Sequence, residues 1–202
     1  MDLLIGAVLT LKKPSDAGIR DFLTRQRESP FSYQEVGATR HAPPQGYVTD
    51  HHRIRLGEGE EIFSKAKLAL DRWAMFQIPW LTLCWPDTPA REGSHVAVLV
   101  QCFGLWILSA CRVVYQVEEK GALERSGFAY GTLPAHMEMG EERFTVEWNR
   151  SDNSVWYDIL AFSRPNHLLS WLGYLYARRL QRQFAQDSLN AMALAAGSLP
   201  DL

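Results

Sequence analysis

The stretch from residue 127 to residue 165 reads GFAYGTLPAHMEMGEERFTVEWNRSDNSVWYDILAFSRP. Within it, the run Arg143–Trp148 alternates polar and apolar residues, which is the pattern of a strand with one buried face. Val155–Phe162 is a second strand candidate, and the polar residues 151–154 between the two runs are typical of a turn. We therefore predict an antiparallel hairpin here, with Pro165 ending its second strand.

More strands are predicted on the amino-terminal side of this hairpin. From Leu81 onward the apolar residues recur with a period of two, and the loops between the runs are short, so consecutive strands should be neighbours in one sheet. Residues 31–36 and 50–56 are shorter candidates, and residues 1–11 fit a strand or a short helix. The principal strand candidates are Leu81–Trp85, His95–Cys102, Leu105–Glu118 and Phe128–Leu133.

Three helices are predicted outside the strand region. Ser15 can cap a first helix that ends before Pro30. A second helix begins around residues 57–61, carries an apolar stripe and ends by Pro79. A third runs from Pro165 to about Met192 and, at roughly 40 Å, is too long to be a connector. Its apolar face would be Leu169, Leu172, Tyr176, Leu180 and Phe184, with Arg178, Arg179 and Arg182 mostly in solvent.

This order of elements predicts the fold class. We expect one α+β domain over residues 1–202, with a frayed tail from about residue 197, in which an antiparallel β-sheet wraps on the long C-terminal helix. This is the helix-grip architecture of START lipid-transfer, polyketide-cyclase-like and plant allergen-like domains. A curved sheet covered on one face by a helix leaves room for a cavity between the two.

Composition argues against several classes of protein. The net charge of −2 and the pI near 6.3 give no general attraction to nucleic acid or acidic membranes. The amino terminus is a poor signal peptide and no apolar run approaches a membrane span, so we expect a cytoplasmic protein without integral membrane association. Cys84, Cys102 and Cys111 lack CxxC spacing, which favours buried thiols over a disulfide scaffold or a metal site. No cofactor is predicted, and the oligomeric state stays open.

Five blocks of sequence, in order along the chain, carry a resemblance to one known family. They are PFSYQEVGAT (30–39), GEGEEIFSKAKLALDRWAMF (57–76), RVVYQVEE (112–119), GFAYGTLPAHMEMGEERF (127–144) and AFSRPNHLL (161–169). Together they resemble the bacterial and plant family catalogued as domain of unknown function number nineteen-ninety, over roughly residues 22–190. The family usually has Gly where this chain has Ala135, a departure that concerns the local backbone shape. The resemblance implies no particular activity.

The leading functional hypothesis is a binding protein for a hydrophobic or amphipathic small molecule. The abundant aromatic residues would line the cavity between the sheet and the C-terminal helix, and one polar group such as Arg112 or Tyr130 would orient the ligand. An arginine that faces the covered side of the sheet needs a carboxylate or an anionic ligand, which brings in Arg164. The predicted ligand-binding residues are Trp73, Arg112, Tyr115, Tyr130, His136, Glu142, Trp156 and Arg164, with Phe144, Trp148 and Tyr157 as further lining.

The alternative hypothesis is an enzyme on the same scaffold. His136, Glu138 and Glu142 form the densest group of titratable residues, and a His next to a carboxylate can transfer protons. The competing interpretation is an exposed hairpin whose charges are solvated. A metal site is not predicted, because His136 and Glu138 supply two ligands where a tight site needs three or four. The pair His51–His52 is assigned to a surface loop.

Overall fold

The computed structural model describes residues 8–166 and 173–198. These residues contain three α-helices, α1 (Asp16–Gln26), α2 (Gly59–Asp71) and α4 (Tyr174–Ala196). The Oγ of Ser15 accepts from the N–H of Gly18, so Ser15 caps α1 as predicted. Two short 3₁₀-helices, Ala38–Arg40 and Ala74–Phe76, complete the helical elements of the described part.

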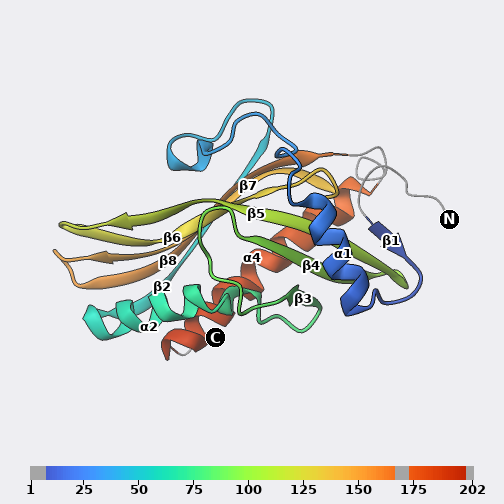
Figure 1. The fold of residues 1–202 in the computed structure, drawn as a ribbon. Helices are drawn as coiled ribbons and strands as arrows, with labels where there is room; N and C mark the ends of the chain where they lie inside the picture. The colour runs from blue at the N-terminus through green and yellow to red at the C-terminus, as the bar shows by residue number, and fades with distance from the viewer. Residues whose placement is uncertain (1–7, 167–172, 199–202) are drawn as a thin grey trace.

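A single antiparallel sheet forms the body of the molecule (Figure 1). Seven of its eight strands follow the order β2-β8-β7-β6-β5-β4-β3, and the eighth, β1, pairs with the part of β5 that β6 does not reach. The predicted neighbours along the chain from β3 to β8 are therefore adjacent. The strands are β1 (Val8–Thr10), β2 (Val48–Glu58), β3 (Leu81–Cys84), β4 (His95–Cys102), β5 (Leu105–Glu119), β6 (Leu123–Thr132), β7 (Glu138–Asn149) and β8 (Ser154–Pro165).

The two faces of the sheet pack against different elements. The inner face meets α2 and α4, with α4 running diagonally behind the sheet in Figure 1. The outer face carries α1 and the segment 27–47. This arrangement confirms the predicted α+β class and helix-grip architecture, in which a curled antiparallel sheet packs on a C-terminal helix. The alternation of side chains along each strand divides the buried residues between two clusters, one on each face.

Several predicted elements differ from those observed. Residues 31–36 form bends and turns instead of a strand, because their side chains dock on the outer face while the backbone does not join a ladder. His51 and His52 lie within β2 and not in a loop. Strands β6, β7 and β8 are longer than predicted at one end or both. The second helix ends at Asp71, since Trp73 adopts a left-handed conformation with φ 54° and a 3₁₀ turn follows.

The C-terminal helix also departs from the prediction. Pro165 is the last residue of β8, and the predicted start of the helix with Leu169 and Leu172 lies outside the described residues. Helix α4 extends to Ala196, beyond the predicted end. Its buried face is Ala185, Ser188, Leu189, Met192, Ala193 and Ala196, which continues the line of Tyr176, Leu180 and Phe184 toward the C-terminus.

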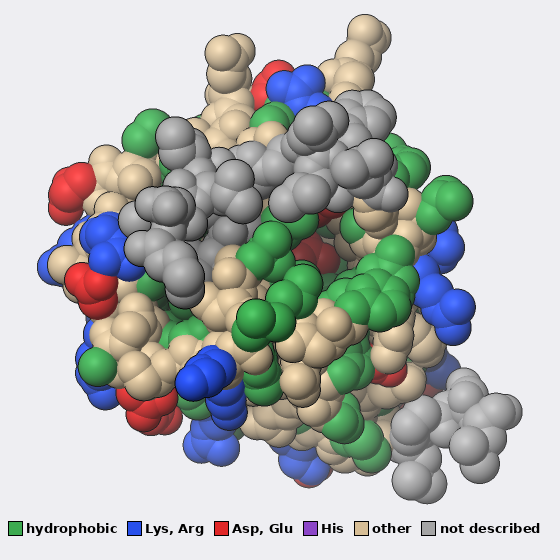
Figure 2. Space-filling view, turned by 90° about the vertical axis from the view of Figure 1, so that its right-hand side faces the viewer, with side chains coloured by type: hydrophobic (Ala, Val, Ile, Leu, Met, Phe, Trp, Pro, Cys, Tyr) green, Lys and Arg blue, Asp and Glu red, His purple; other side chains and the backbone are tan. Residues whose placement is uncertain are grey.

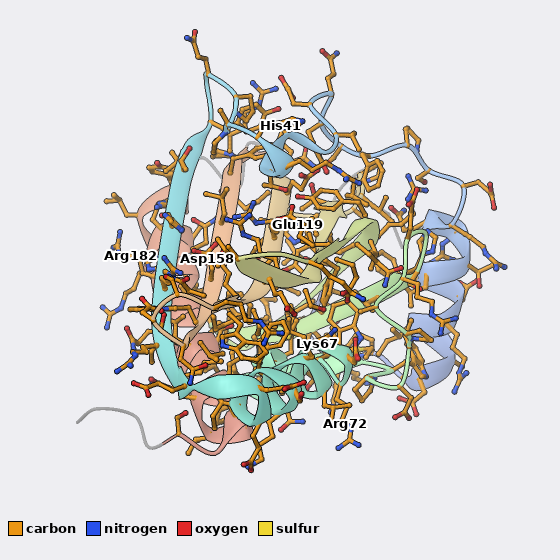
Figure 3. All side chains as sticks on the ribbon, turned by 90° about the vertical axis from the view of Figure 1, so that its left-hand side faces the viewer. His41, Lys67, Arg72, Glu119, Asp158 and Arg182 are labelled. Atoms are coloured by element: carbon orange, nitrogen blue, oxygen red, sulfur yellow. The ribbon has the colours of Figure 1, made fainter. Side chains whose placement is uncertain are left out.

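The three cysteines and the α4 arginines do not all behave as expected. Cys84 and Cys111 are buried, whereas Cys102 is only partly buried at the end of β4. Arg178 turns toward the sheet and binds both carboxylate oxygens of Asp50 on β2 at 2.6 Å. Arg182 points away from the sheet, in agreement with the predicted solvated face (Figure 3).

Candidate functional site

The centre of the inner face holds a cluster of aromatic rings. Neighbouring rings lie with their centroids 4.7 to 6.0 Å apart, in tilted or edge-to-face arrangements. Such contacts add to the burial energy of the rings. The Nε1 of Trp73 donates to the carbonyl oxygen of Thr88, so the one polar atom of this indole is satisfied. We call these residues the aromatic cluster: Trp73, Phe76, Phe128, Tyr130, Phe144 and Phe184.

A partly buried acid lies at the edge of the aromatic cluster. Glu142 on β7 accepts a hydrogen bond of 2.8 Å from the Tyr130 hydroxyl on β6, the residue directly opposite in the sheet. Burial raises the pKa of Glu142 to about 7; the Tyr130 hydrogen bond acts in the opposite direction and the charge of Asp50 adds to the rise. A carboxyl group with this pKa exchanges its proton near neutral pH.

A second acid stands on the same strand and the same face. Glu138 is four residues before Glu142, about 13 Å away along an extended strand. Burial raises its pKa to about 7 as well, with Arg178 partly offsetting the effect. Arg178 itself is bound by Asp50. In the described part of the chain, the ion pairs within 4.0 Å include neither Glu138 nor Glu142.

The inner face at this end therefore combines acidic and apolar groups. Gln181 of α4 donates to the Ser163 hydroxyl on β8, which places further polar atoms near the beginning of the helix. Figure 2 looks at the end where α4 begins and shows an acidic side chain recessed between hydrophobic ones. We call Tyr130, Glu138, Glu142 and the Asp50–Arg178 pair the acidic site.

His136 contacts the acidic site through the backbone of Glu138, two residues further along the chain. It lies in the turn between β6 and β7, where its Nδ1 accepts from the Glu138 N–H at 3.0 Å. Asn166 donates to the His136 carbonyl oxygen at 2.9 Å, which ties the turn to the end of β8. The imidazole thus holds the start of β7 in place, at Glu138.

Four of the residues predicted to line the space under the helix lie on the outer face instead. Arg112 stacks on Phe31 with 4.2 Å to the ring centroid and donates to the Ser29 carbonyl oxygen at 3.2 Å. Tyr115 follows a β-bulge between Val113 and Tyr115, which turns its hydroxyl toward Thr39 at 2.7 Å. The expectation for Tyr115 failed because the bulge shifts the alternation of side chains between the two faces of β5. The other two are Trp156, which stacks with Arg53, and Arg164, which stacks with Tyr47.

The outer face also carries charged residues that the sequence did not single out. Asp158 on β8 is buried and bridges His51 of β2, at 2.6 Å, and Arg143 of β7, at 3.2 Å; its place in the sheet is marked in Figure 3. Period-two alternation could have indicated that these three side chains share a face, but the pairing of β2 with β8 could not be derived from local sequence.

Two concavities outlined by described residues lie away from the acidic site. One of about 540 Å³ lies on the outer face around Trp156 and Arg125, and one of about 510 Å³ lies between α1 and residues 92–95. Within the described ranges, no three His, Cys, Asp or Glu side chains come together as a group that could hold a metal ion. None of the helices described is long and apolar enough to cross a membrane.

The fold and this site define the chain as a helix-grip protein with an acidic site beside the C-terminal helix. Residues 32–191 match the family described as Domain of unknown function (DUF1990), and the chain belongs to this family. A UPF0548 protein of Dictyostelium discoideum is 36% identical over 205 residues, covering 93% of this chain and 95% of the relative. A UPF0548 protein of Deinococcus radiodurans is 36% identical over 199 residues, covering 93% and 98%.

Among solved structures, the chain is similar to a crystal structure of Ara h 8.0201. The TM-score is 0.48 with 10% sequence identity, and the similarity covers 75% of this chain and 98% of that one. The fold of the present chain rests on its own sheet order and helix packing, described above.

The raised pKa of Glu142 predicts a gain of stability in a variant. In the folded protein this pKa is about 7, above its ordinary value of 4.5, so stability is highest when the group is protonated and falls as pH rises through 7. We expect Glu142→Gln to be more stable than the parent by about 1–2 kcal/mol at pH 8 and nearly unchanged at pH 4. Urea unfolding at both pH values measures this, and equal stability at pH 8 would contradict it.

Proposed function

We propose that this protein binds an amphipathic small molecule at the acidic site, with the apolar part of the ligand against the aromatic cluster. The observation that carries the proposal is the pair of partly buried acids, Glu138 and Glu142, neither of which makes an ion pair within 4.0 Å in the described part of the chain, while the nearby Arg178 is held by Asp50. Keeping such groups costs stability, and sites that cost stability are often retained for function.

The chemistry of the site favours a ligand that brings a hydrogen-bond donor or a positive charge. A protonated amine would pair with Glu142 or Glu138 and return each pKa toward its ordinary value, because an opposite charge favours the ionised carboxylate. Rings such as Phe76, Phe184 and Tyr130 offer the apolar contacts that most ligand sites use alongside a few polar groups. An alkyl or aryl amine meets both demands.

A matched series of ligands tests this proposal. Dodecylamine, dodecanol and dodecanoate share one tail and differ in the head group, and isothermal titration calorimetry at pH 7.5 measures their affinities. We expect dodecylamine to bind most tightly, and Glu142→Gln to weaken it about fivefold or more while leaving dodecanol unchanged. Glu119→Gln, on an exposed carboxylate at the end of β5, is the matched control. Tighter binding of dodecanoate, or no binding of any member, would overturn the proposal.

A second candidate is proton transfer to the bound molecule by Glu142. This candidate is favoured because the Glu142 carboxyl group has a pKa of about 7 and accepts a hydrogen bond of 2.8 Å from the Tyr130 hydroxyl. In this scheme His136 stabilises the turn between β6 and β7, and Glu138 binds the ligand. The test uses NMR to monitor the exchange of the α-protons of an amphipathic ketone for deuterium from D₂O. Uptake with the parent and none with Glu142→Gln would support catalysis, and equal rates with both would exclude this role.

A further inference from the structure

Four apolar side chains gather where β4 turns into β5 and α4 begins. Leu11, Phe103 and Leu175 are 81%, 82% and 83% exposed, which is unusual for large apolar residues. The Phe103 ring lies 4.7 Å from the ring of Tyr176, and pairing of Thr10 with Trp106 brings Leu11 to the same end. Hydrophobic side chains are prominent on this end of the molecule in Figure 2. We call Leu11, Phe103, Leu175 and Tyr176 the apolar tip.

Phe103 occupies a backbone conformation that suits it poorly. The β4–β5 turn has positive φ at both Phe103 (49°) and Gly104 (76°). Two-residue turns of this kind favour Asn-Gly or Gly-Gly, since left-handed backbone is costly for a bulky side chain. The chain thus accepts both strain and exposure at one aromatic residue. Among the described residues, the aromatic ring in contact with Phe103 is that of Tyr176.

Every charged residue close to the apolar tip in sequence is basic. Within three positions of its four members lie Lys12, Lys13, Arg178 and Arg179, and no Asp or Glu. Lys13 stands over the Trp106 ring at 5.4 Å, and Arg179 is exposed one turn after Leu175. Exposed aromatic and aliphatic groups bordered by Lys and Arg are typical of surfaces that lie on lipid bilayers, where rings enter the interface and cations meet anionic head groups.

We propose that the apolar tip is a docking surface for membranes that contain anionic lipids. Phe103, Leu175 and Leu11 enter the interfacial layer, and Lys12, Lys13 and Arg179 contact the head groups. Charge complementarity favours an anionic bilayer over a neutral apolar partner, because the charged residues within three positions of the tip in sequence are basic. The tip lies at the same end as the beginning of α4 and the acidic site, but the docking proposal stands independently of the proposed ligand.

Vesicle flotation tests the proposal directly. The full chain is mixed with phosphatidylcholine vesicles that contain about 30% phosphatidylserine, and with pure phosphatidylcholine vesicles. We expect binding to the anionic vesicles that weakens on raising NaCl from about 0.05 M to about 0.5 M. The double variant Phe103→Ser/Leu175→Ser should bind at least about tenfold more weakly. Arg179→Glu should lose about fivefold or more on anionic vesicles only.

Matched controls use exposed residues at other places. Leu68 on α2 and Leu194 near the end of α4 are 55% and 64% exposed, so Leu68→Ser/Leu194→Ser removes comparable apolar surface without touching the tip. Arg72→Glu, at the end of α2, matches Arg179→Glu (Figure 3). Equal losses with tip and control variants would overturn the proposal. Absence of vesicle binding by the parent would also overturn the proposal. This includes the case in which sedimentation shows a dimer that the tip variant abolishes.

A substitution at Phe103 separates docking from folding. Phe103→Asn suits the left-handed conformation better, so the melting temperature should rise by about 2 °C. Vesicle binding should fall at the same time, because the aromatic ring is lost. A variant that is both more stable and still fully bound would show that Phe103 has no part in docking.

Discussion

Glu141→Ala is expected to lower the free energy of unfolding by about 4 kcal/mol. Glu141 lies on the outer face of β7 and is 2% exposed. It accepts hydrogen bonds from the Tyr33 hydroxyl at 2.7 Å and from the Gly37 N–H at 2.7 Å. The N–H of Thr39, at 3.0 Å, and its hydroxyl complete the set. Hydrogen bonds to a charged group are worth about 1.5–3 kcal/mol each.

The reason for the size of the effect is that the donors stay buried when the carboxylate is removed. The segment that carries Tyr33, Gly37 and Thr39 has no ladder of its own, and Glu141 binds it at three residues, beside the contact of Ser32 with Thr132. Urea unfolding measures the change, with Glu61→Ala as a control on an exposed carboxylate that pairs with Lys65 of the same helix. Glu141→Gln, which keeps one acceptor oxygen, should lower the free energy of unfolding by less than Glu141→Ala and by more than Glu61→Ala. A loss below about 1 kcal/mol in Glu141→Ala would contradict this role.

Gly140→Ala is expected to destabilise the protein by at least about 3 kcal/mol. Gly140 lies on β7 between the two acids of the acidic site. A Cβ added there would come within 1.9 Å of the Phe162 carbonyl oxygen on β8, which is backbone and cannot move aside alone. The neighbouring strands would have to separate, and β7 would carry Glu138 and Glu142 with it. We therefore expect both lower stability and weaker binding of dodecylamine.

The matched control for this glycine is Gly18→Ala in α1. A Cβ at Gly18 meets only the Ser15 Oγ at 3.4 Å, an ordinary contact. Alanine also favours a helix over glycine by up to about 1 kcal/mol, so this variant should be as stable as the parent or more so. Thermal unfolding of both variants gives the comparison. Equal melting temperatures would show that β7 and β8 can separate at little cost.

The candidate site was predictable in part. Tyr130 and Glu142 were named from sequence and lie together on the inner face, since both sit at regular positions of strands with clear alternation. Tyr115 was assigned to the wrong face because a bulge is a backbone irregularity with no strong sequence signal. Asp50 was missed because its importance depends on Arg178, which is distant in the chain.

Local sequence patterns were enough to predict the class of the fold. The alternation from Leu81 onward, the turn at residues 151–154 and the long amphipathic C-terminal stretch follow from helix and strand periodicity. The face that each side chain occupies and the distant groups that it meets depend on how the strands and helices pack together. The pairing of β2 with β8 brings Asp50 to Arg178, and docking of residues 31–40 on the outer face makes Glu141 a buried anchor. Such contacts depend on strand register and on burial, which are properties of the assembled sheet.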